Sequence, residues 1–165
     1  MSLEQGQVEA TRAALRNWLR YRLLLLTRLP MGLLAGLRVS ELTESRCAVS
    51  VPFKWLNRNP FRSTFWAVLG MAAEMSTGAL ILMYTQKQSP SLATIITGTT
   101  GQFMKKAVGR TTFVCENGDE IVDAVRQAMD TPDPVEVICS TRGVDEAGEV
   151  VAEFTFTWSM KKREE

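Results

Sequence analysis

Glu74 is the one charged residue in an apolar stretch of 24 residues, STFWAVLGMAAEMSTGALILMYTQ, at positions 63–86. A carboxylate that leaves water without a partner is costly, so it binds a proton more tightly, pairs with another group or serves a reaction. Burial raises the pKa of such a group and makes it a stronger base. The sequence therefore indicates Glu74 as a candidate general base.

Two glycines flank this carboxylate. Gly70 and Gly78 lie four positions before and after Glu74, which places all three on one face of a helix. The glycines leave a groove beside the carboxylate with room for a ligand or a water molecule. The alternative is a structural carboxylate, held by backbone amides or by the hydroxyl groups of Ser76 and Thr77.

The complete absence of histidine narrows the chemistry further. It excludes a Ser-His-Asp or Cys-His nucleophile, a His-bearing metal site and a dehydratase dyad of His with Asp or Glu. Any general base must therefore be Asp, Glu, Lys, Tyr or Cys. We expect no metal and no cofactor.

Composition bounds the class of protein. The chain has 165 residues and a net charge of +1, which predicts one domain and gives no electrostatic case for nucleic acid. Three separated cysteines without a CxxC motif indicate reduced core thiols of a cytoplasmic protein, namely Cys47, Cys115 and Cys139.

Two apolar stretches raise the question of a membrane. Residues 63–86 are long enough to span a bilayer, but the water-soluble sheet pattern after residue 90 disfavours that interpretation. The stretch YRLLLLTRLPMGLLAGL, at positions 21–37, is interrupted by Arg28 and Pro30 and lacks the order of a signal peptide. Peripheral membrane contact by this N-terminal region is the more plausible of the two, although we do not expect it.

The elements that position Glu74 follow from periodicity. Residues 4–28 have helical spacing and predict one helix that ends at Pro30. Alternation predicts a strand in residues 46–53 with one buried face, paired with residues 37–45. Ser63 or Thr64 is the predicted N-cap of the long apolar helix, and Ser89-Pro90 its end.

The second half of the chain predicts strands and one short helix. Residues 91–109 form a long strand with a bulge near Gly98 and Gly101, and residues 110–116 form another. Residues 118–130 are amphipathic and predict a helix. Residues 134–143 and 149–162 then form a hairpin across Asp145 and Gly148.

This order predicts an α+β protein, in which an antiparallel sheet wraps around one long central helix, with an extra N-terminal helix. That arrangement is the hotdog fold. We expect an N-terminal helical extension over residues 1–36 and a hotdog domain over residues 37–165, in a single domain overall.

Three features of residues 37–162 resemble the PaaI-like hotdog acyl-CoA thioesterases and their relatives of unknown function. Asn59 precedes Glu74 by 15 positions, similar to the offset of an Asn and an acidic residue in those enzymes. FMKKAVG, at positions 103–109, resembles the end of their central strand. DEAGEVVAEFTFTW, which begins at Asp145, resembles their closing hairpin.

The chain departs from these thioesterases at the start of the long helix. Phe65, Trp66 and Ala67 stand where the family carries His-Gly-Gly. The two glycines allow close backbone approach to the thioester carbonyl, and Trp66 and Ala67 crowd that approach.

The resemblance implies roles for the candidate residues. Glu74 would deprotonate a water molecule or attack the thioester as a nucleophile, and backbone N–H groups near Trp66 and Ala67 would stabilise the oxyanion. Asn59 would bind the carbonyl or position the water, unless it forms only an Asx turn before Pro60. The carboxylate and the helix N-terminus of one site would come from different protomers of a homodimer.

Substrate contacts are expected at a second set of positions. Gly70 and Gly78 would line the groove and Thr99 would face it, whereas ordinary strand polarity is the alternative for Thr99. Basic residues at the strand end would bind the phosphates of coenzyme A, or would only solvate the sheet edge. These residues are Lys105, Lys106 and Arg110.

The sequence thus predicts a cytoplasmic homodimer, or a tetramer built from two dimers, that hydrolyses an acyl-CoA. Coenzyme A enters only as part of the substrate. The main alternative is a non-catalytic protein that binds acyl-CoA, a fatty acyl chain or another lipid. A third possibility is a structural partner protein in which Glu74 pairs internally.

Overall fold

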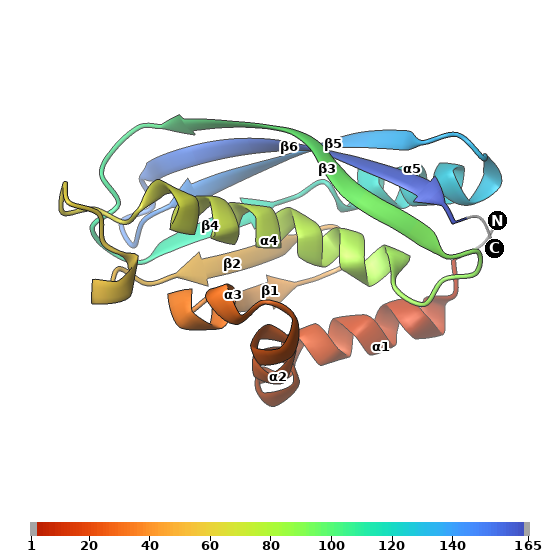
Figure 1. Ribbon diagram of the computed structural model, residues 1–165, viewed down its shortest axis with the longest axis horizontal. Helices are drawn as coiled ribbons and strands as arrows, with labels where there is room; N and C mark the ends of the chain where they lie inside the picture. Colours follow the sequence, from red (N-terminus) through yellow and green to blue (C-terminus); the bar gives the residue numbers. More distant parts are fainter. Residues whose placement is uncertain (1–2, 164–165) are drawn as a thin grey trace.

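The computed structural model describes residues 3–163 (Figure 1). Its helices are α1 (Gln5–Arg16), α2 (Trp18–Arg28), α3 (Pro30–Ala35), the 3-10 helix η1 (Trp55–Asn57), α4 (Trp66–Thr85) and α5 (Gly118–Asp130). Its strands are β1 (Arg38–Leu42), β2 (Cys47–Val51), β3 (Leu92–Phe103), β4 (Thr111–Cys115), β5 (Val135–Val144) and β6 (Val150–Lys162).

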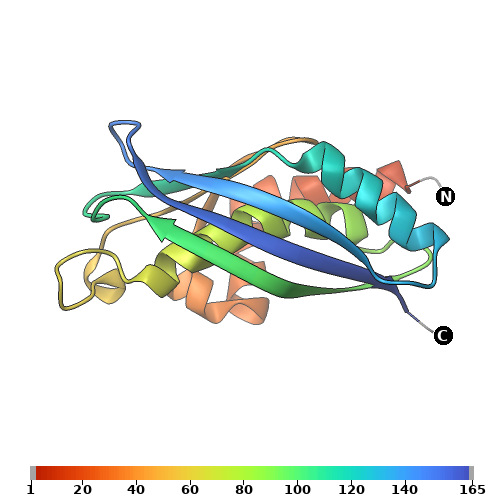
Figure 2. The same ribbon diagram turned by 90° about the horizontal axis from the view of Figure 1, so that it is seen from above.

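The six strands form one sheet in the order β1-β2-β4-β5-β6-β3, and every neighbouring pair is antiparallel. The sheet curves around α4, as Figures 1 and 2 show from two directions. The predicted architecture is therefore confirmed. It places β3, the longest uncharged strand, at one edge of the sheet.

Helix α4 is buried along most of its length because its composition is apolar almost all round. An 18-residue window of this 20-residue helix has a mean hydropathy of 1.5, so α4 is long and apolar enough to span a bilayer, and the sheet packs against it. The predicted caps are wrong. The N-cap is Phe65, because Thr64 instead donates from N and Oγ1 to the carbonyl oxygen of Ala107. The helix ends at Thr85, before Ser89.

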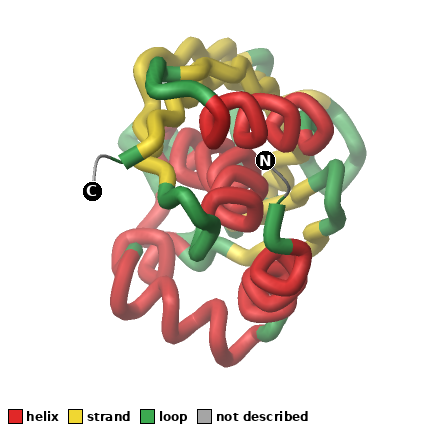
Figure 3. The backbone as a smooth tube through the Cα atoms, turned by 90° about the vertical axis from the view of Figure 1, so that its right-hand side faces the viewer, coloured by secondary structure: helices red, strands yellow, loops and turns green. Residues whose placement is uncertain are grey.

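Two helices, α1 and α2, occupy residues 4–28, where one helix was predicted, and α3 follows them. Asn17 adopts an extended conformation and its side chain accepts a hydrogen bond from the backbone N–H of Arg20 at 3.0 Å, which ends α1 and starts α2. Pro30 occupies the first turn of α3. Figure 3 shows these helices gathered beside α4 at one side of the sheet.

Most of the predicted strand detail is confirmed. The bulge in β3 lies between Ile96 and Gly98, and β5 and β6 form the expected hairpin. Strand β2 differs, since all five of its side chains are buried and not only one face. Ala48 and Ser50, on its second face, are short and lie between β1 and β4, so little of either reaches water.

One hydrophobic core joins the N-terminal helices to the sheet. Val8, Leu15 and Leu25 are buried in the same cluster as the side chains of α4 and the strands. The predicted boundary at residue 36 falls between α3 and β1, where Gly36 has a φ of 82° that favours glycine. The three cysteines are buried and free, as the thiol prediction required.

Candidate active site on helix α4

Glu74 is half-buried in the middle of α4. Within residues 3–163 its carboxylate has no hydrogen-bond donor and no ion-pair partner. Its backbone oxygen accepts a hydrogen bond from Oγ1 of Thr77 at 2.9 Å, but the hydroxyls of Thr77 and Ser76 do not reach the carboxylate. Burial raises the pKa of Glu74 above its usual value. The structural role proposed as the alternative therefore lacks the partners that it requires.

Of the two glycines predicted to flank this carboxylate, Gly78 lies next to it, whereas Gly70 lies next to Phe154. A Cβ built on Gly78 would lie 3.9 Å from Oε1 of Glu74 and 3.5 Å from the indole of Trp158. A Cβ on Gly70 would meet only the ring of Phe154, at 3.8 Å. Both positions are half-exposed, so the absent side chains leave accessible space along this face of α4.

The aromatic residues of β6 form the opposite wall. Phe154 lies near Gly70 and Trp158 near Gly78, which puts Phe156 at the level of Glu74. Thr99 is paired with Phe156 across β3 and β6. Its neighbour two residues on, Gly101, faces the ring of Phe154, so alternation places Thr99 on the face of the sheet that carries these rings.

The start of α4 presents free backbone donors. Phe65 is the N-cap and has no side-chain hydrogen bond to the first turn. The N–H groups of Trp66 and Ala67 find no acceptor within residues 3–163. Their dipoles and the positive end of the helix would stabilise an anion there. The indole of Trp66 is 60% exposed and stands next to these donors.

The loop before α4 is held by two asparagines. Asn59 Oδ1 accepts hydrogen bonds from the N–H groups of Phe61 and Ser63, at 3.0 and 3.1 Å, so its side chain forms the Asx turn that was the alternative to a catalytic role. Asn57 is buried and donates from Nδ2 to the carbonyl oxygens of Ala35 and Pro52. Its own carbonyl oxygen accepts from the N–H of Phe65 at 2.7 Å, which positions the N-terminus of α4.

A pocket of about 280 Å³ opens beside this helix start. It brings together four of the predicted site residues, Asn59, Trp66, Lys105 and Lys106. The other predicted residues, Ala67, Gly70, Glu74, Gly78, Thr99 and Arg110, do not line it. The remaining lining residues are Ser63, Thr64, Leu69, Phe103, Met104 and Ala107.

The three predicted phosphate-binding residues do not form one cluster. Lys105 binds Asp145 at 2.7 Å and also Glu149, and these carboxylates raise its pKa. Lys106 donates to the carbonyl oxygen of Phe61 at 3.4 Å and lines the pocket. Arg110 lines a different pocket, next to α2. Lys106 is therefore the cation left for a phosphate at this site.

Glu74 lies eight positions after Trp66, about 12 Å along the helix axis at 1.5 Å per residue. A carbonyl group bound at the free N–H groups of one chain is therefore too far from the carboxylate of the same helix. Within residues 3–163 no group of His, Cys, Asp and Glu side chains could hold a metal ion. The site can supply a base, helix N–H donors and an apolar wall.

Three residues of this arrangement had not been singled out for a role at the site. Asn57 was given no role, although an Asn in a loop before a helix is a signal for capping or bracing. Thr77 was named only as a possible partner of Glu74, and Trp158 was included only in the closing hairpin. They form a buried hydrogen bond, from Nε1 to Oγ1 at 3.0 Å, and no local pattern predicts a pair 81 residues apart.

Comparison with solved structures shows which proteins share the fold of this chain. A protein of unknown function from Pseudomonas aeruginosa, named "Probable Thioesterase", matches with a TM-score of 0.74 at 22% identity over 94% of this chain and 95% of that one. A protein of unknown function from Chlorobaculum tepidum matches with a TM-score of 0.75 at 13% identity, over 98% of each chain. A thioesterase from Haemophilus influenzae matches with a TM-score of 0.63 at 12% identity, over 85% of this chain and 88% of that one. The chain shares the hotdog fold of these structures.

The family can be stated more narrowly. Residues 20–160 match the model of the domain of unknown function DUF4442, so the chain belongs to that family. No curated protein matches the sequence. The match begins within α2 and ends within β6, so it includes α4 and every strand of the sheet.

Proposed function

We propose that this protein is an acyl-CoA thioesterase in which Glu74 is the catalytic base. The observation that carries the proposal is the half-buried carboxylate of Glu74, which has no partner within residues 3–163, has a raised pKa and lies beside Gly78. A structural carboxylate would be bonded to the groups around it. An unpartnered one with open space beside it is suited to accept a proton from water.

The proposed reaction has two steps. The carboxylate of Glu74 takes a proton from a water molecule, and the oxygen adds to the thioester carbon to form a tetrahedral intermediate. The N–H groups of Trp66 and Ala67 stabilise its oxyanion. The intermediate then collapses, the C–S bond breaks, and the thiolate of coenzyme A takes the proton from Glu74. The products are a carboxylic acid and free coenzyme A.

The distance between these groups requires a second copy of the chain. Since Glu74 and Trp66 of one helix are about 12 Å apart, one copy supplies the carboxylate and the other the N–H donors. Strand β3 favours such a dimer: its twelve residues contain no charge, and within the described part of the chain only β6 pairs with it. Unprotected edge strands of this kind readily pair with another chain. Ile95 on this strand is largely exposed.

In this dimer the pocket beside the helix start receives the thioester end of the substrate. Lys106 is the proposed contact for a coenzyme A phosphate, because Lys105 is already held by Asp145 and Glu149. The exposed side chains of Trp66, Phe103 and Met104 offer apolar contacts for the acyl chain. The buried, free thiols are consistent with a cytoplasmic protein.

The first test is hydrolysis of acyl-CoAs from acetyl to palmitoyl, and of phenylacetyl-CoA, with a dye that detects the released thiol. We expect turnover with the wild type and at least a hundredfold loss in Glu74→Gln, the typical contribution of a general base. Glu120→Gln makes the same change at an exposed position on α5 and should keep full activity. Equal turnover in Glu74→Gln and wild type would exclude Glu74 as the base.

The proposed dimer is tested by measuring the molecular mass of the protein in solution. Ile95→Lys places a charge on the edge of β3, so we expect light scattering to show a monomer and the same assay to show lost turnover. Lys87→Gln, in the loop after α4, is the control for a change of one charge outside the strand. A monomeric wild type with full activity would contradict a site shared between two chains.

A second function, binding without hydrolysis, is favoured by one observation. Trp66 stands 60% exposed at the helix start, at a position where the thioesterase motif has glycine, and it narrows access to the N–H donors. A folded protein that hydrolyses no acyl-CoA but is stabilised by one would have this function. At a hundredfold excess of ligand over its Kd, binding to the native state alone adds about 2.7 kcal/mol to the free energy of unfolding.

A further inference from the structure

The N-terminal helices concentrate positive charge. Residues 10–40 contain six arginines and no Asp or Glu. Because the whole chain has a net charge of +1, the rest of it carries −5. Arg12 pairs with Glu9 and Glu44, whereas the other five guanidinium groups form no ion pair within residues 3–163. This end of the molecule therefore presents a positive surface.

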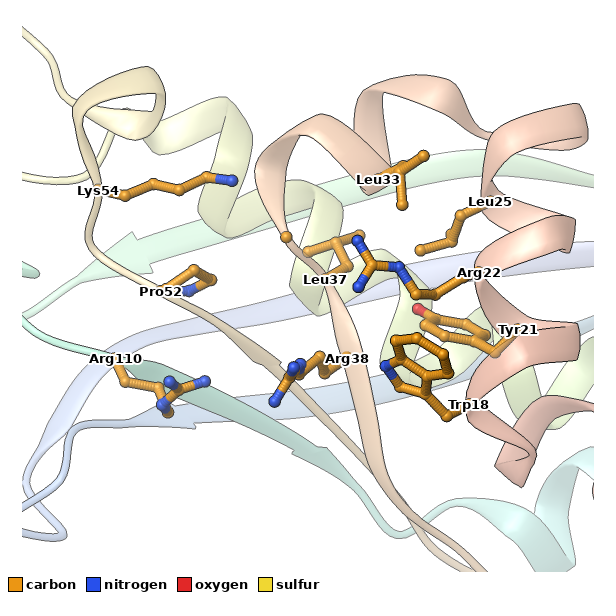
Figure 4. Close-up of a pocket in the computed structure, with 11 residues that line it drawn as sticks. Trp18, Tyr21, Arg22, Leu25, Leu33, Leu37, Arg38, Pro52, Lys54 and Arg110 are labelled. Carbon is orange, nitrogen blue, oxygen red and sulfur yellow. The ribbon is translucent and has the colours of Figure 1, made fainter.

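A pocket of about 320 Å³ opens on this surface, between α2, α3 and the strands that follow them (Figure 4). Its charged lining residues are all basic: Arg22, Arg38, Lys54 and Arg110. None of the four forms an ion pair within residues 3–163. The rest of the lining is apolar or aromatic, and consists of Trp18, Tyr21, Leu25, Leu33, Gly36, Leu37 and Pro52. Four cations around one cavity attract a group of high negative charge.

Tyr21 provides a separate indication of a ligand. Its side chain is only 5% exposed, it lines this pocket, and its hydroxyl group has no hydrogen-bond partner among residues 3–163. In Figure 4 the hydroxyl oxygen is directed toward Leu37 and the guanidinium group of Arg22. A buried hydroxyl without a partner costs free energy that an acceptor in the pocket would recover. Burial also raises the pKa of Tyr21, so the hydroxyl keeps its proton as a donor.

Exposed apolar side chains lie on α2 and α3, the two helices that contribute to the pocket wall. Trp18, Leu19, Leu23 and Leu26 on α2 are each more than half exposed, as are two residues on α3, Met31 and Leu34. The three leucines of α2 follow helical spacing and share one face. The Arg22 guanidinium lies 5.2 Å from the centre of the Trp18 ring, where a cation and an aromatic ring attract each other. Leucine, tryptophan and arginine on one surface are typical of helices that lie in a membrane interface.

We propose that this face docks on an anionic phospholipid bilayer, with a lipid phosphate held in the pocket by Arg22, Arg38 and the Tyr21 hydroxyl. The leucines of α2 then enter the boundary between headgroups and acyl chains. Charge complementarity selects this occupant, because an apolar partner surface alone would leave five unpaired arginines without counter-charges. The proposal does not depend on Glu74 or on hydrolysis.

The test is sedimentation of the full chain with vesicles of phosphatidylcholine alone or mixed with phosphatidic acid. We expect binding only to the mixed vesicles, and weaker binding as salt rises. The double variant Arg22→Gln, Arg38→Gln should bind roughly thirtyfold more weakly, given the usual contribution of a basic side chain near an anionic surface. The control Lys87→Gln, Lys162→Gln removes two charges outside residues 10–40 and should bind as the wild type does.

Two further variants distinguish the contribution of the pocket to vesicle binding from the effects of overall charge and of lost folding stability. Tyr21→Phe removes only the unpartnered hydroxyl, so we expect weaker vesicle binding with an unchanged or higher Tm. Leu23→Ser should weaken binding through the exposed face of α2 without changing the core. The turnover of soluble acyl-CoA by the double arginine variant should match the wild type, which distinguishes this proposal from the thioesterase proposal.

Several outcomes would overturn the proposal. Equal binding to both kinds of vesicle would show that the net negative charge of the headgroup has no role. An equal loss in the lysine control would show that net charge alone accounts for the effect. Stabilisation by inorganic phosphate without any vesicle binding would instead assign the pocket to a soluble phosphate ligand. A change in mass in the Leu23→Ser variant, again without vesicle binding, would assign this face to a contact between copies of the chain.

Discussion

Trp158 on β6 donates a hydrogen bond from Nε1 to Oγ1 of Thr77 on α4, across 3.0 Å. Thr77 in turn donates to the carbonyl oxygen of Glu74 at 2.9 Å. Since one hydroxyl has a single proton, the two bonds have a fixed direction, from Trp158 through Thr77 to the backbone of Glu74. This connection sets the rotation of α4 against the sheet, and with it the position of the Glu74 carboxylate.

We expect Thr77→Val to destabilise the protein by about 1–3 kcal/mol, because it leaves the buried indole N–H of Trp158 without an acceptor. Thr77→Ser keeps the hydroxyl and should lose much less. Urea denaturation followed by tryptophan fluorescence measures both. Equal stability of the valine and serine variants would show that the hydrogen bond contributes nothing beyond packing.

Glu74 should make the stability of the protein depend on pH. Burial raises its pKa in the folded state above the usual 4.5, so the folded protein binds this proton more tightly than the unfolded chain does. The resulting stabilisation is fully present below pH 4.5 and is lost as the pH rises through the folded-state pKa. Glu74→Gln should therefore have a higher Tm than the wild type at neutral pH, with the difference disappearing toward pH 4.5.

A thermal melt at each pH, with Glu120→Gln as the control for an exposed carboxylate, measures this effect. A wild-type advantage at neutral pH would mean that the ionised carboxylate of Glu74 has a stabilising partner. That result would favour the structural interpretation of Glu74 over the catalytic one.

Gly78→Ala should raise stability and lower activity together. The added methyl group would lie 3.5 Å from the Trp158 ring, an ordinary contact, and alanine favours a helix interior over glycine by about 1 kcal/mol. The same methyl group occupies the space beside Oε1 of Glu74, so turnover of acyl-CoA should fall. Gly6→Ala on α1, where a Cβ meets nothing within 4 Å, is the matched control.

The paired measurement is Tm and turnover on the same samples. An alanine variant that gains stability and keeps full turnover would show that the substrate does not use the space over Gly78. Loss of stability would contradict the contact distances.

The three thiols should be unreactive in the folded protein. Cys47, Cys115 and Cys139 are buried, and burial together with the charges of Cys115 and Glu41 raises the pKa of Cys47 to about 12. A thiol dye should therefore react with no cysteine in buffer and with all three in denaturant. Rapid reaction of the native protein would show that the core opens, and it would also add a background to the thioesterase assay.

The local sequence pattern was sufficient to predict those helices and strands whose stabilising contacts repeat regularly along the chain. Helix α5 begins and ends at the predicted residues, and it is amphipathic as predicted, since Ile121, Val125 and Met129 are buried on one face. In β6 the rings of Phe154, Phe156 and Trp158 are buried while the threonines between them are half-buried. Hydrophobic periodicity predicts such elements because burial of one face is what stabilises them.

Caps and breaks were predicted less well because a short polar side chain has several possible partners. Thr64 fits an N-cap, yet Ala107, 43 residues away, binds both its N–H and its hydroxyl. Asn17 fits a helix interior as well as a cap, and it divides the predicted first helix in two. The choice depends on which acceptor the folded chain brings within reach.

Among the functional residues, too, the sequence predicts some features and only the folded structure determines others. The identity of Glu74 as the unusual residue, and the space left by Gly70 and Gly78, follow from 3.6 residues per turn and from the cost of burying charge. Folding determines which groups meet. It commits Lys105 to carboxylates 40 and 44 residues away, and it gathers four cations around Tyr21 from α2, β1, and the segments before η1 and β4. These contacts between distant residues depend on how the sheet curves around α4, and the spacing of residues along the chain does not predict that curvature.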